Sequence, residues 1–338
     1  MPLSEFLARH LPLIEEEMRA VVGSDGSVLG EYYEMMHYHL GWSEHGQGPA
    51  VSGKRIRPAL SLLACAGAGG EARTALPAAA AIELIHNFTL VHDDIQDDSQ
   101  SRRGRPTVWR LWGRAQAINA GDALFTIAHL ALQRLTGRGM SPDAALEAIA
   151  VLDQTCLELT RGQHLDMSFE SRAAVSVAEY WQMIEGKTAA LIAAAADLGA
   201  LCAGATVSRR QAYREFGRVL GLAFQAHDDI LGIWGDSAET GKSSATDIQT
   251  RKKSLPVVYG LERSPRLTTL YSAPEEDGGG PVADIVAELE RVGARQHAET
   301  EAARLSHAAI HALEHAEPAN EAGALLHALA SELLGRRR

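Results

Sequence analysis

Cysteine is scarce in this sequence. The three cysteines, Cys65, Cys156 and Cys202, form no C-x-x-C motif and lie in apolar segments with a helical pattern. An odd number of cysteines without such a motif argues against a disulfide framework or a zinc site and is typical of a reducing compartment. The first residues also lack a basic segment followed by an apolar run, so we predict no secretory signal and a cytoplasmic protein.

Excess positive charge and long uncharged apolar runs are lacking too. Lys and Arg total 32 against 43 Asp and Glu, which gives a net charge of −11. Because a nucleic-acid-binding surface needs clustered positive charge, we predict no nucleic-acid partner. The most apolar stretch, residues 188–207, contains Asp197 and consists largely of alanine. A membrane span needs about 20 predominantly apolar residues, so we predict a buried helix there and no transmembrane segment.

Strand patterns are almost absent, whereas helical patterns are frequent. The 338 residues are 46% hydrophobic and 22% charged, which is typical of a globular protein with a sizeable core. Apolar residues recur at spacings of three and four, which indicates helices. Since the mean helix has about 11–12 residues, we predict one all-α domain over residues 1–338, a single large bundle of about a dozen helices. Helix starts are expected at Ser141-Pro142 and at two capping boxes, Ser176 to Glu179 and Ser208 to Gln211.

An acidic cluster follows an apolar helical pattern that begins near Leu76. Residues three and four apart share a face of a helix, so Asp97 is stacked with Asp93 and Asp94. Carboxylates at this spacing repel one another, and a hard cation between them removes that cost. Oxygen ligands without Cys or His suit Mg²⁺, which is completed by water and substrate phosphates. The alternative is a solvated acidic helix end.

A second acidic pair, Asp228 and Asp229, lies near the C-terminal part of another apolar helix. Carboxylates at a helix C-terminus face an unfavourable dipole, so a purely structural role is less attractive there. The following segment contains Lys242 and Lys252, and a solvated run of charges is the alternative for it.

Several cations accompany the two acidic clusters. Arg102 and Arg103 either neutralise the first cluster or hold diphosphate oxygens, for which arginine is well suited. Lys54 and Arg57 are three residues apart in a segment that is not a P-loop, so the alternative is an exposed loop or a basic helix start. Lys187 adjoins an apolar run, where an unpaired charge is costly. We expect its partner to be Glu185 or a phosphate.

The order of these motifs resembles that of the trans-isoprenyl diphosphate synthases, the polyprenyl synthetase family, over roughly residues 50–260. No Ser/His/Asp or Cys/His set competes with this interpretation. The resemblance rests on the following segments: Gly53-Lys-Arg-Ile-Arg-Pro58, Glu83 to Asp94, Arg102 to Thr107, Gly121-Asp122, Gly162-Gln163, Lys187-Thr188, Phe224-Gln225 with Asp228-Asp229, and Gly241-Lys242 with Asp247.

The resemblance implies an all-α fold around a central cavity, a homodimer and three Mg²⁺ ions in each active site. It implies that the metal ligands are Asp93, Asp94 (less often a direct ligand), Asp97 and Asp228. It assigns the allylic diphosphate to Arg102, Lys187, Lys242 and Lys252, and isopentenyl diphosphate to Lys54, Arg57, His86 and Arg103. Thr188 and Gln225 are expected to line the carbocation region. One departure stands out, because the family's second motif usually ends in Asp where this chain has Gly232.

The product length depends on residues just before the first acidic cluster. Phe88 precedes Asp93 by five residues, about 7.5 Å along a helix. A ring there could form the floor of the tunnel for the growing chain, and ordinary core packing is the alternative. One aromatic at this position followed by a small residue, here Thr89, resembles geranylgeranyl diphosphate synthases. We therefore favour a C20 product, with C15, C25 and longer products as alternatives.

Two other functions remain to be weighed. A terpene-synthase-like cyclase would ionise a prenyl diphosphate at the same kind of metal site. It would not need Lys54, Arg57 and His86, and 5% aromatic residues offer few rings to stabilise a migrating cation. A non-catalytic subunit of a heteromeric synthase would not need intact Asp93, Asp94 and Asp97.

Overall fold

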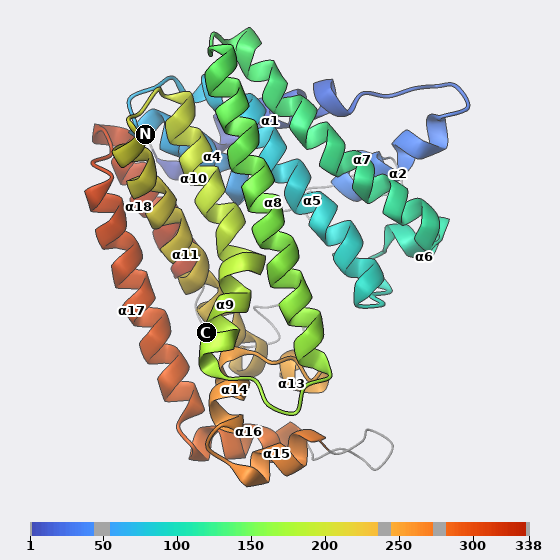
Figure 1. Ribbon diagram of the computed structural model, residues 1–338, viewed down its shortest axis with the longest axis vertical. Coiled ribbons are helices and arrows are strands. Elements are labelled where there is room, and N and C mark those ends of the chain that lie inside the picture. Colours follow the sequence, from blue (N-terminus) through green and yellow to red (C-terminus); the bar gives the residue numbers. More distant parts are fainter. Residues whose placement is uncertain (1, 44–54, 236–244, 273–281, 336–338) are drawn as a thin grey trace. The chain divides into compact units, whose positions relative to one another are not determined.

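The computed structural model describes residues 2–43, 55–235, 245–272 and 282–335, and it confirms the all-α prediction (Figure 1). In these residues the only strands are the two-residue β1 (Ser101–Arg102) and β2 (Arg105–Pro106). They pair antiparallel, with Ser101 opposite Pro106. The hairpin follows the first acidic cluster.

Two compact units make up the described chain. Unit 1 comprises Met1–Gln154, Ala194–Gln211 and Glu317–Leu326, and unit 2 comprises Thr155–Ala193, Ala212–Ala316 and His327–Arg338. A single domain over residues 1–338, with a central cavity, stays a prediction.

The core of unit 1 is built around one long apolar helix. This helix, α5 (Leu76–Gln96), lies beside α7 (Arg114–Gln133) and also packs on α1 and α4 (Figure 1). Its first ten residues are all buried, and Pro77 occupies the first turn, where its missing N–H costs nothing. The remaining helices of this unit are α1 (Leu3–Val22), α2 (Gly30–Leu40), α4 (Ile56–Gly67), η2 (Ala72–Ala75), α6 (Val108–Trp112), η3 (Arg134–Arg138) and the first part of α8 (Pro142–Glu170).

One described segment, Ala72–Gln96, is long and apolar enough to cross a membrane by length and composition. Its most apolar window is 72% buried within the protein, as in a core helix. The apolar stretch predicted to be a buried helix forms α10 (Ala190–Cys202), whose alanines 193–196 are at most 1% exposed. That prediction is confirmed.

Unit 2 contains the second half of α8 and a continuous run of helical residues that passes through a π-turn. The run is α9 (Val177–Ile184), the π-turn η4 (Glu185–Ala189) and the start of α10. The later elements are α11 (Val207–Trp234), α13 (Thr246–Gln249), α14 (Leu255–Leu261), α15 (Pro265–Ser272), α16 (Val282–Arg291), α17 (Ala294–His315) and α18 (Asn320–Leu334). Of these, α11 and α18 also contribute residues to unit 1.

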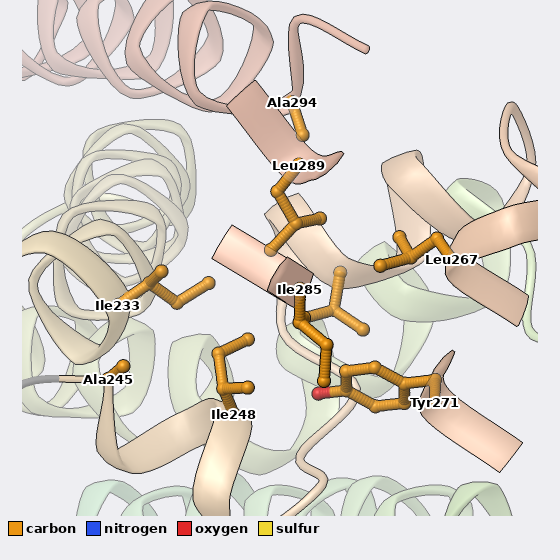
Figure 2. Close-up of a cluster of buried hydrophobic side chains, with 9 residues drawn as sticks. Ile233, Ala245, Ile248, Leu267, Tyr271, Ile285, Leu289 and Ala294 are labelled. Atoms are coloured by element: carbon orange, nitrogen blue, oxygen red, sulfur yellow. The ribbon is translucent and has the colours of Figure 1, made fainter. Parts of the chain in front are cut away.

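A small apolar cluster fixes the end of α11 to the elements that follow it. Ile233 of α11, Ile248 of α13 and Ile285 of α16 are all nearly inaccessible to solvent and lie in this cluster with Tyr271 (Figure 2). Burial of such side chains stabilises the folded state by about 1.5–3 kcal/mol each. The cluster therefore holds α13 next to the second acidic pair.

Two of the three predicted helix starts are confirmed. Ser176 and Glu179 form a reciprocal capping box, and Ser141 Oγ accepts a hydrogen bond from the Ala144 N–H at 3.2 Å. The capping box predicted at Ser208 is wrong. Helix α11 begins at Val207, and Thr206 Oγ1 accepts from the Arg209 N–H at 3.4 Å, so the cap lies two residues earlier.

Candidate active site

The end of α5 presents the first acidic cluster in unit 1. The helix ends at Gln96, but the Asp97 N–H still donates to the Asp93 carbonyl at 2.8 Å, so both residues belong to one turn. Asp93 is half-buried and Asp97 is exposed, whereas Asp94 is only 1% exposed. The three carboxylates therefore do not occupy equivalent environments.

Asp94 is held by Arg102 of the β1–β2 hairpin. The Arg102 Nε lies 2.9 and 3.0 Å from the two carboxylate oxygens, and its terminal nitrogen lies 2.8 Å from Oδ1. Burial raises the pKa of Asp94, although Arg102 opposes this shift. Of the two roles considered for Arg102, this structure shows the ion pair, and Asp94 joins the helix end to the hairpin.

Four residues of unit 1, Arg57, His86, Arg102 and Arg103, form an arginine–histidine cluster. The terminal N–H of Arg57 donates to His86 Nε2 at 3.2 Å. Burial lowers the pKa of His86 well below its usual range, and Arg57, Arg103 and Arg102 lower it further. His86 is therefore neutral, and the cluster presents arginine charge beside an uncharged imidazole. Lys54, predicted to join this group, lies outside the described residues.

The oxygen donors in unit 1 suit magnesium rather than zinc or iron. Among the described residues, no three His, Cys, Asp or Glu side chains come close enough to hold a metal ion by themselves. Mg²⁺ does not need such a cage, because it is usually held by one or two carboxylates, water and substrate phosphates. Asp93 and Asp97, one turn apart at the end of α5, match that requirement.

The second acidic pair divides in a similar way in unit 2. Asp229 is fully buried and accepts hydrogen bonds from Tyr180 Oη at 2.6 Å, Leu255 N at 2.8 Å and Gln225 Nε2 at 2.8 Å. Asp228 is half-buried instead. Burial and the adjoining Asp229 raise the pKa of Tyr180 well above its usual range, so its hydroxyl remains a donor.

Lys252 lies beside the same pair, 3.5 Å from Asp229 Oδ1 and 3.7 Å from Asp247 Oδ2. Burial acts to lower its pKa, but Asp229, Asp247 and Asp228 reverse that effect and raise it. Lys252 is therefore a fixed cation. Lys242, its predicted companion, lies outside the described residues.

The π-turn η4 carries Lys187 and Thr188. The ammonium group of Lys187 forms a short ion pair with Asp166 of α8, and Thr188 Oγ1 donates to Gln225 Oε1 at 3.0 Å. The predicted partner Glu185 is wrong, since Glu185 contacts Arg218 at 3.0 Å. Residues two apart do not share a helix face, so Lys187 turns to α8 instead.

Close backbone contact fixes the position of this π-turn. A Cβ atom on Gly162 of α8 would lie 2.1 Å from the Lys187 nitrogen and 2.6 Å from the Gly186 carbonyl carbon. Only glycine permits α8 and η4 to approach this closely. π-turns inside helices occur frequently at functional sites, and here the turn carries two of the predicted site residues.

Asp247 occupies the space beside Gly232, the departure in the second motif. A Cβ atom at residue 232 would lie 2.5 Å from Asp247 Oδ2 and 2.9 Å from Oδ1. The carboxylate of Asp247 thus lies where the first atoms of a side chain at residue 232 would be. The sequence shows that the second motif lacks its last carboxylate. The structure shows the Asp247 carboxylate beside residue 232, where that carboxylate is missing.

The predicted tunnel residue Phe88 belongs to a row of rings in unit 1. Its ring makes edge-on contacts with Phe125 of α7 at 5.2 Å and with His92 at 4.8 Å between centroids. Phe125 in turn lies 4.7 Å from His129. Thr89 donates its hydroxyl proton to the His86 carbonyl at 2.8 Å. Phe88 is therefore both packed and half-buried, and its role as the floor of a tunnel stays a prediction.

Sequence reasoning missed Phe125, Asp166 and Tyr180 as members of the site. No spacing rule connects them to their partners, because each contact joins helices that are distant along the chain. The one available signal was the expectation that Lys187 needs Glu185 or a phosphate as its partner. The structure gives it a carboxylate, but that of Asp166 rather than Glu185.

Comparison with known proteins gives consistent results at the levels of sequence and structure. The family model described as Polyprenyl synthetase matches residues 47–289. A (2E,6E)-farnesyl diphosphate synthase from Mycobacterium tuberculosis is 46% identical over 279 residues, 80% of this chain and 76% of that protein. A geranylgeranyl diphosphate synthase from the same organism is 45% identical over 246 residues, 71% and 69% of the two chains. The crystal structure of a polyprenyl synthetase from Streptomyces coelicolor A3(2) matches with a TM-score of 0.89 and 36% identity, over 98% of this chain and 99% of that one.

Proposed function

The chain belongs to the polyprenyl synthetase family and is a trans-prenyltransferase. We propose that it condenses isopentenyl diphosphate head-to-tail with an allylic prenyl diphosphate and that the product is geranylgeranyl diphosphate. The observation that carries the proposal is the arginine–histidine cluster of unit 1. Arg57 and Arg103 add cationic groups beyond the Arg102–Asp94 pair, as a second diphosphate substrate requires. A cyclase has one diphosphate substrate and no use for them.

In unit 1 the cluster binds isopentenyl diphosphate through Arg57, His86 and Arg103, with Lys54 in the role that the resemblance implies. Within the described part of the chain, the Nε of Arg57 is buried without a hydrogen-bond partner, and a buried donor in that state costs about 1–3 kcal/mol. A diphosphate oxygen would remove that cost. Arginine is the side chain best suited to such oxygens because it donates from a planar fork.

In unit 2, Lys187 and Lys252 bind the allylic diphosphate. The resemblance gives the same role to Lys242 and to Arg102. Each of the three described cations already has a carboxylate partner, Asp166, Asp229 and Asp94 respectively. Those partners keep the cations oriented before substrate arrives. Preorganised charge of this kind stabilises the leaving group as its charge develops.

Synthases of this family generally use Mg²⁺. We assign Asp93 and Asp97 as its ligands in unit 1 and Asp228 as a ligand in unit 2, and the resemblance implies three ions in all. When bound, Mg²⁺ supplies positive charge that neutralises the diphosphate leaving group. The carbon–oxygen bond of the allylic substrate then breaks, the alkene of isopentenyl diphosphate attacks the allylic cation, and the departing diphosphate takes up the proton that is lost.

Thr188 and Gln225 stabilise the allylic cation. The hydroxyl proton of Thr188 is donated to the Gln225 carbonyl oxygen, and the Gln225 amide donates to the buried Asp229. This chain fixes the orientation of both side chains. The lone pairs of the Thr188 oxygen are therefore left for a developing positive charge, because its only proton is already used.

The ring pair of Phe88 and Phe125 supports a C20 product. Phe88 lies five residues before Asp93 on α5, and its ring contacts the Phe125 ring. The two rings would therefore form a rigid barrier to a growing prenyl chain. The two relatives described above include both a farnesyl and a geranylgeranyl diphosphate synthase, which leaves chain length to such local features.

We also propose that the protein is a homodimer. Four large apolar side chains of unit 1 are 44–63% exposed, namely Leu111, Ile118, Leu130 and Leu146. Packing of these side chains against a second copy of the chain would remove their apolar surface from water. Sedimentation analysis of the purified protein would give a dimer mass, and a monomer at micromolar concentration would contradict this part of the proposal.

The decisive experiment incubates purified protein with Mg²⁺, isopentenyl diphosphate and dimethylallyl, geranyl or farnesyl diphosphate in turn. Products are sized after phosphatase treatment. Geranylgeraniol that requires both substrates and disappears with a chelator supports the proposal. A C15 or longer product corrects the chain length alone, and hydrocarbon formed from the allylic substrate alone indicates a cyclase.

The chain-length assignment is tested with two variants of one residue. Phe88→Ala removes the ring that contacts Phe125, so the product should lengthen by one or more C5 units. Phe88→Tyr keeps a ring of the same width and should retain the wild-type product. An unchanged product distribution in Phe88→Ala would show that this ring is not the floor.

A further inference from the structure

His39, near the end of α2, lies in the electrostatic surroundings of the arginine–histidine cluster of unit 1. Burial lowers the pKa of His39 to about 3, and Arg102, Arg103, Arg55 and Arg105 contribute further to that shift. His39 is also among the groups that lower the pKa of His86. Two neutral imidazoles therefore share one cationic environment.

The Nε2 atom of His39 is buried and has no hydrogen-bond partner among the residues that the structure describes. Buried polar atoms in folded proteins are nearly always satisfied, so each exception calls for an explanation such as a bound ion or ligand. The Nε of Arg57, in the arginine–histidine cluster, is another such atom. In the tautomer that carries its proton on Nε2, His39 adds a second buried donor beside Arg57, and an anion would satisfy both.

The neighbouring arginines do not supply an acceptor for His39. Arg55 is held by Glu15 at 2.7 Å and Glu83 at 2.6 Å, and Arg102 is held by Asp94. Their guanidinium groups are donors only. The carboxylates of Glu15, Glu83 and Asp94 thus already have arginine partners, and a bound anion would supply an acceptor for His39.

We propose that His39 is a further binding residue for isopentenyl diphosphate, donating its Nε2 proton to a diphosphate oxygen beside Arg57, His86 and Arg103. This inference rests on the proposed function. A neutral histidine suits the place because it adds a donor without adding charge to a group of arginines that already repel one another. It also makes the pocket specific, since a site built to donate hydrogen bonds rejects ligands that lack the acceptor.

The test measures steady-state kinetics of the full-length protein with each substrate varied while the other is saturating. A hydrogen bond to a charged acceptor is worth enough to change binding about tenfold or more. His39→Ala should therefore raise the KM for isopentenyl diphosphate about tenfold, with little change in the KM for the allylic substrate. A merely structural role would affect both substrates alike.

Two further variants distinguish loss of the donor from loss of packing. His39→Gln places an amide nitrogen near the position of Nε2 and should restore most of the wild-type KM, whereas the shorter His39→Asn should not. His37→Ala is the matched control on the same helix, because His37 Nε2 contacts the Gly23 carbonyl at 2.9 Å on the exposed side. It should leave both KM values unchanged.

The inference is overturned if His39→Ala keeps the wild-type KM for isopentenyl diphosphate, or if both KM values rise together. Should His39→Ala fail to fold, the Gln and Asn variants carry the test, and equal KM values for these two would overturn it. Absence of turnover by the wild-type protein would instead refute the proposed function, so the two failures are distinguishable.

Discussion

Replacing Gly232 by aspartate restores the usual pattern of the second motif, and we expect it to destabilise this protein. Atoms of the Asp247 carboxylate lie 2.5, 2.6 and 2.9 Å from the position of the missing Cβ. Neither backbone can retreat easily, because Ile233 and Ile248, the neighbours of the two residues, are fixed in one apolar cluster (Figure 2). The two carboxylates would compete for one space.

The expected loss of unfolding free energy follows from two contributions. Overpacking costs about 1–3 kcal/mol, and two like charges about 4 Å apart add up to about 4 kcal/mol at an effective dielectric constant of about 20. Partial reorientation of Asp247 reduces both, so we expect Gly232→Asp to lose about 2–5 kcal/mol. Gly232→Ala carries no charge and gains about 1 kcal/mol of helix propensity, so its net loss should be at most about 2 kcal/mol.

The compensating double variant makes the test sharp. Gly232→Asp combined with Asp247→Gly moves the carboxylate from one element to the other and removes the clash. It should recover at least about 1 kcal/mol relative to the value expected from adding the two single variants and should retain product formation. Urea unfolding and the prenyl-transfer assay measure the two effects. If Gly232→Asp is as stable as the wild type, or if the two substitutions are additive, the reasoning is refuted.

Two more substitutions test the positions of Lys187 and Asp229. Gly162→Ala should lower the unfolding free energy by about 1–3 kcal/mol and reduce turnover, because its Cβ would lie 2.1 Å from the Lys187 nitrogen. The control in thermal unfolding is Gly137→Ala, whose Cβ would lie in open space. Equal melting temperatures of the two variants would contradict the contact. Tyr180→Phe removes the 2.6 Å hydrogen bond to buried Asp229 and should cost about 1.5–3 kcal/mol in denaturant unfolding; a loss below about 0.5 kcal/mol would show that Leu255 N and Gln225 suffice.

The sequence was informative wherever the physical cause is local. The spacing of Asp93, Asp94 and Asp97 predicts a shared helical turn because helix geometry alone determines it, and α5 indeed ends there. The capping box at Ser176 depends on three consecutive peptide units and is confirmed. The cap at Ser208 failed by two residues because Thr206 satisfies the same chemistry.

Contacts between distant segments were not predictable in the same way. Lys187 pairs with Asp166, 21 residues earlier, and Phe88 meets Phe125 on another helix. Nothing in the spacing of these residues determines how α5 packs on α7 or how the π-turn packs on α8. The general requirement that a buried charge needs a partner was correct, but the identity of the partner depends on packing.

The two aspartate pairs, Asp93-Asp94 and Asp228-Asp229, share one arrangement of buried and half-buried carboxylates. In each pair the second carboxylate is buried and is held by the protein. Asp94 binds Arg102 of the hairpin, and Asp229 binds Tyr180 and the Leu255 N–H, from α9 and from the start of α14. The first carboxylate of each pair, Asp93 or Asp228, is only half-buried.

This division of roles resolves the electrostatic difficulty of two adjacent carboxylates near a helix C-terminus. A buried carboxylate with two or three donors is compensated within the protein, so it adds little repulsion to its neighbour. It also joins the helix end to another element and thereby fixes the direction of the first carboxylate. The adjacent Asp-Asp sequence is therefore best understood as one anchoring residue and one residue available to a ligand, which is why Asp93 and Asp228 rather than Asp94 and Asp229 are assigned to the metal.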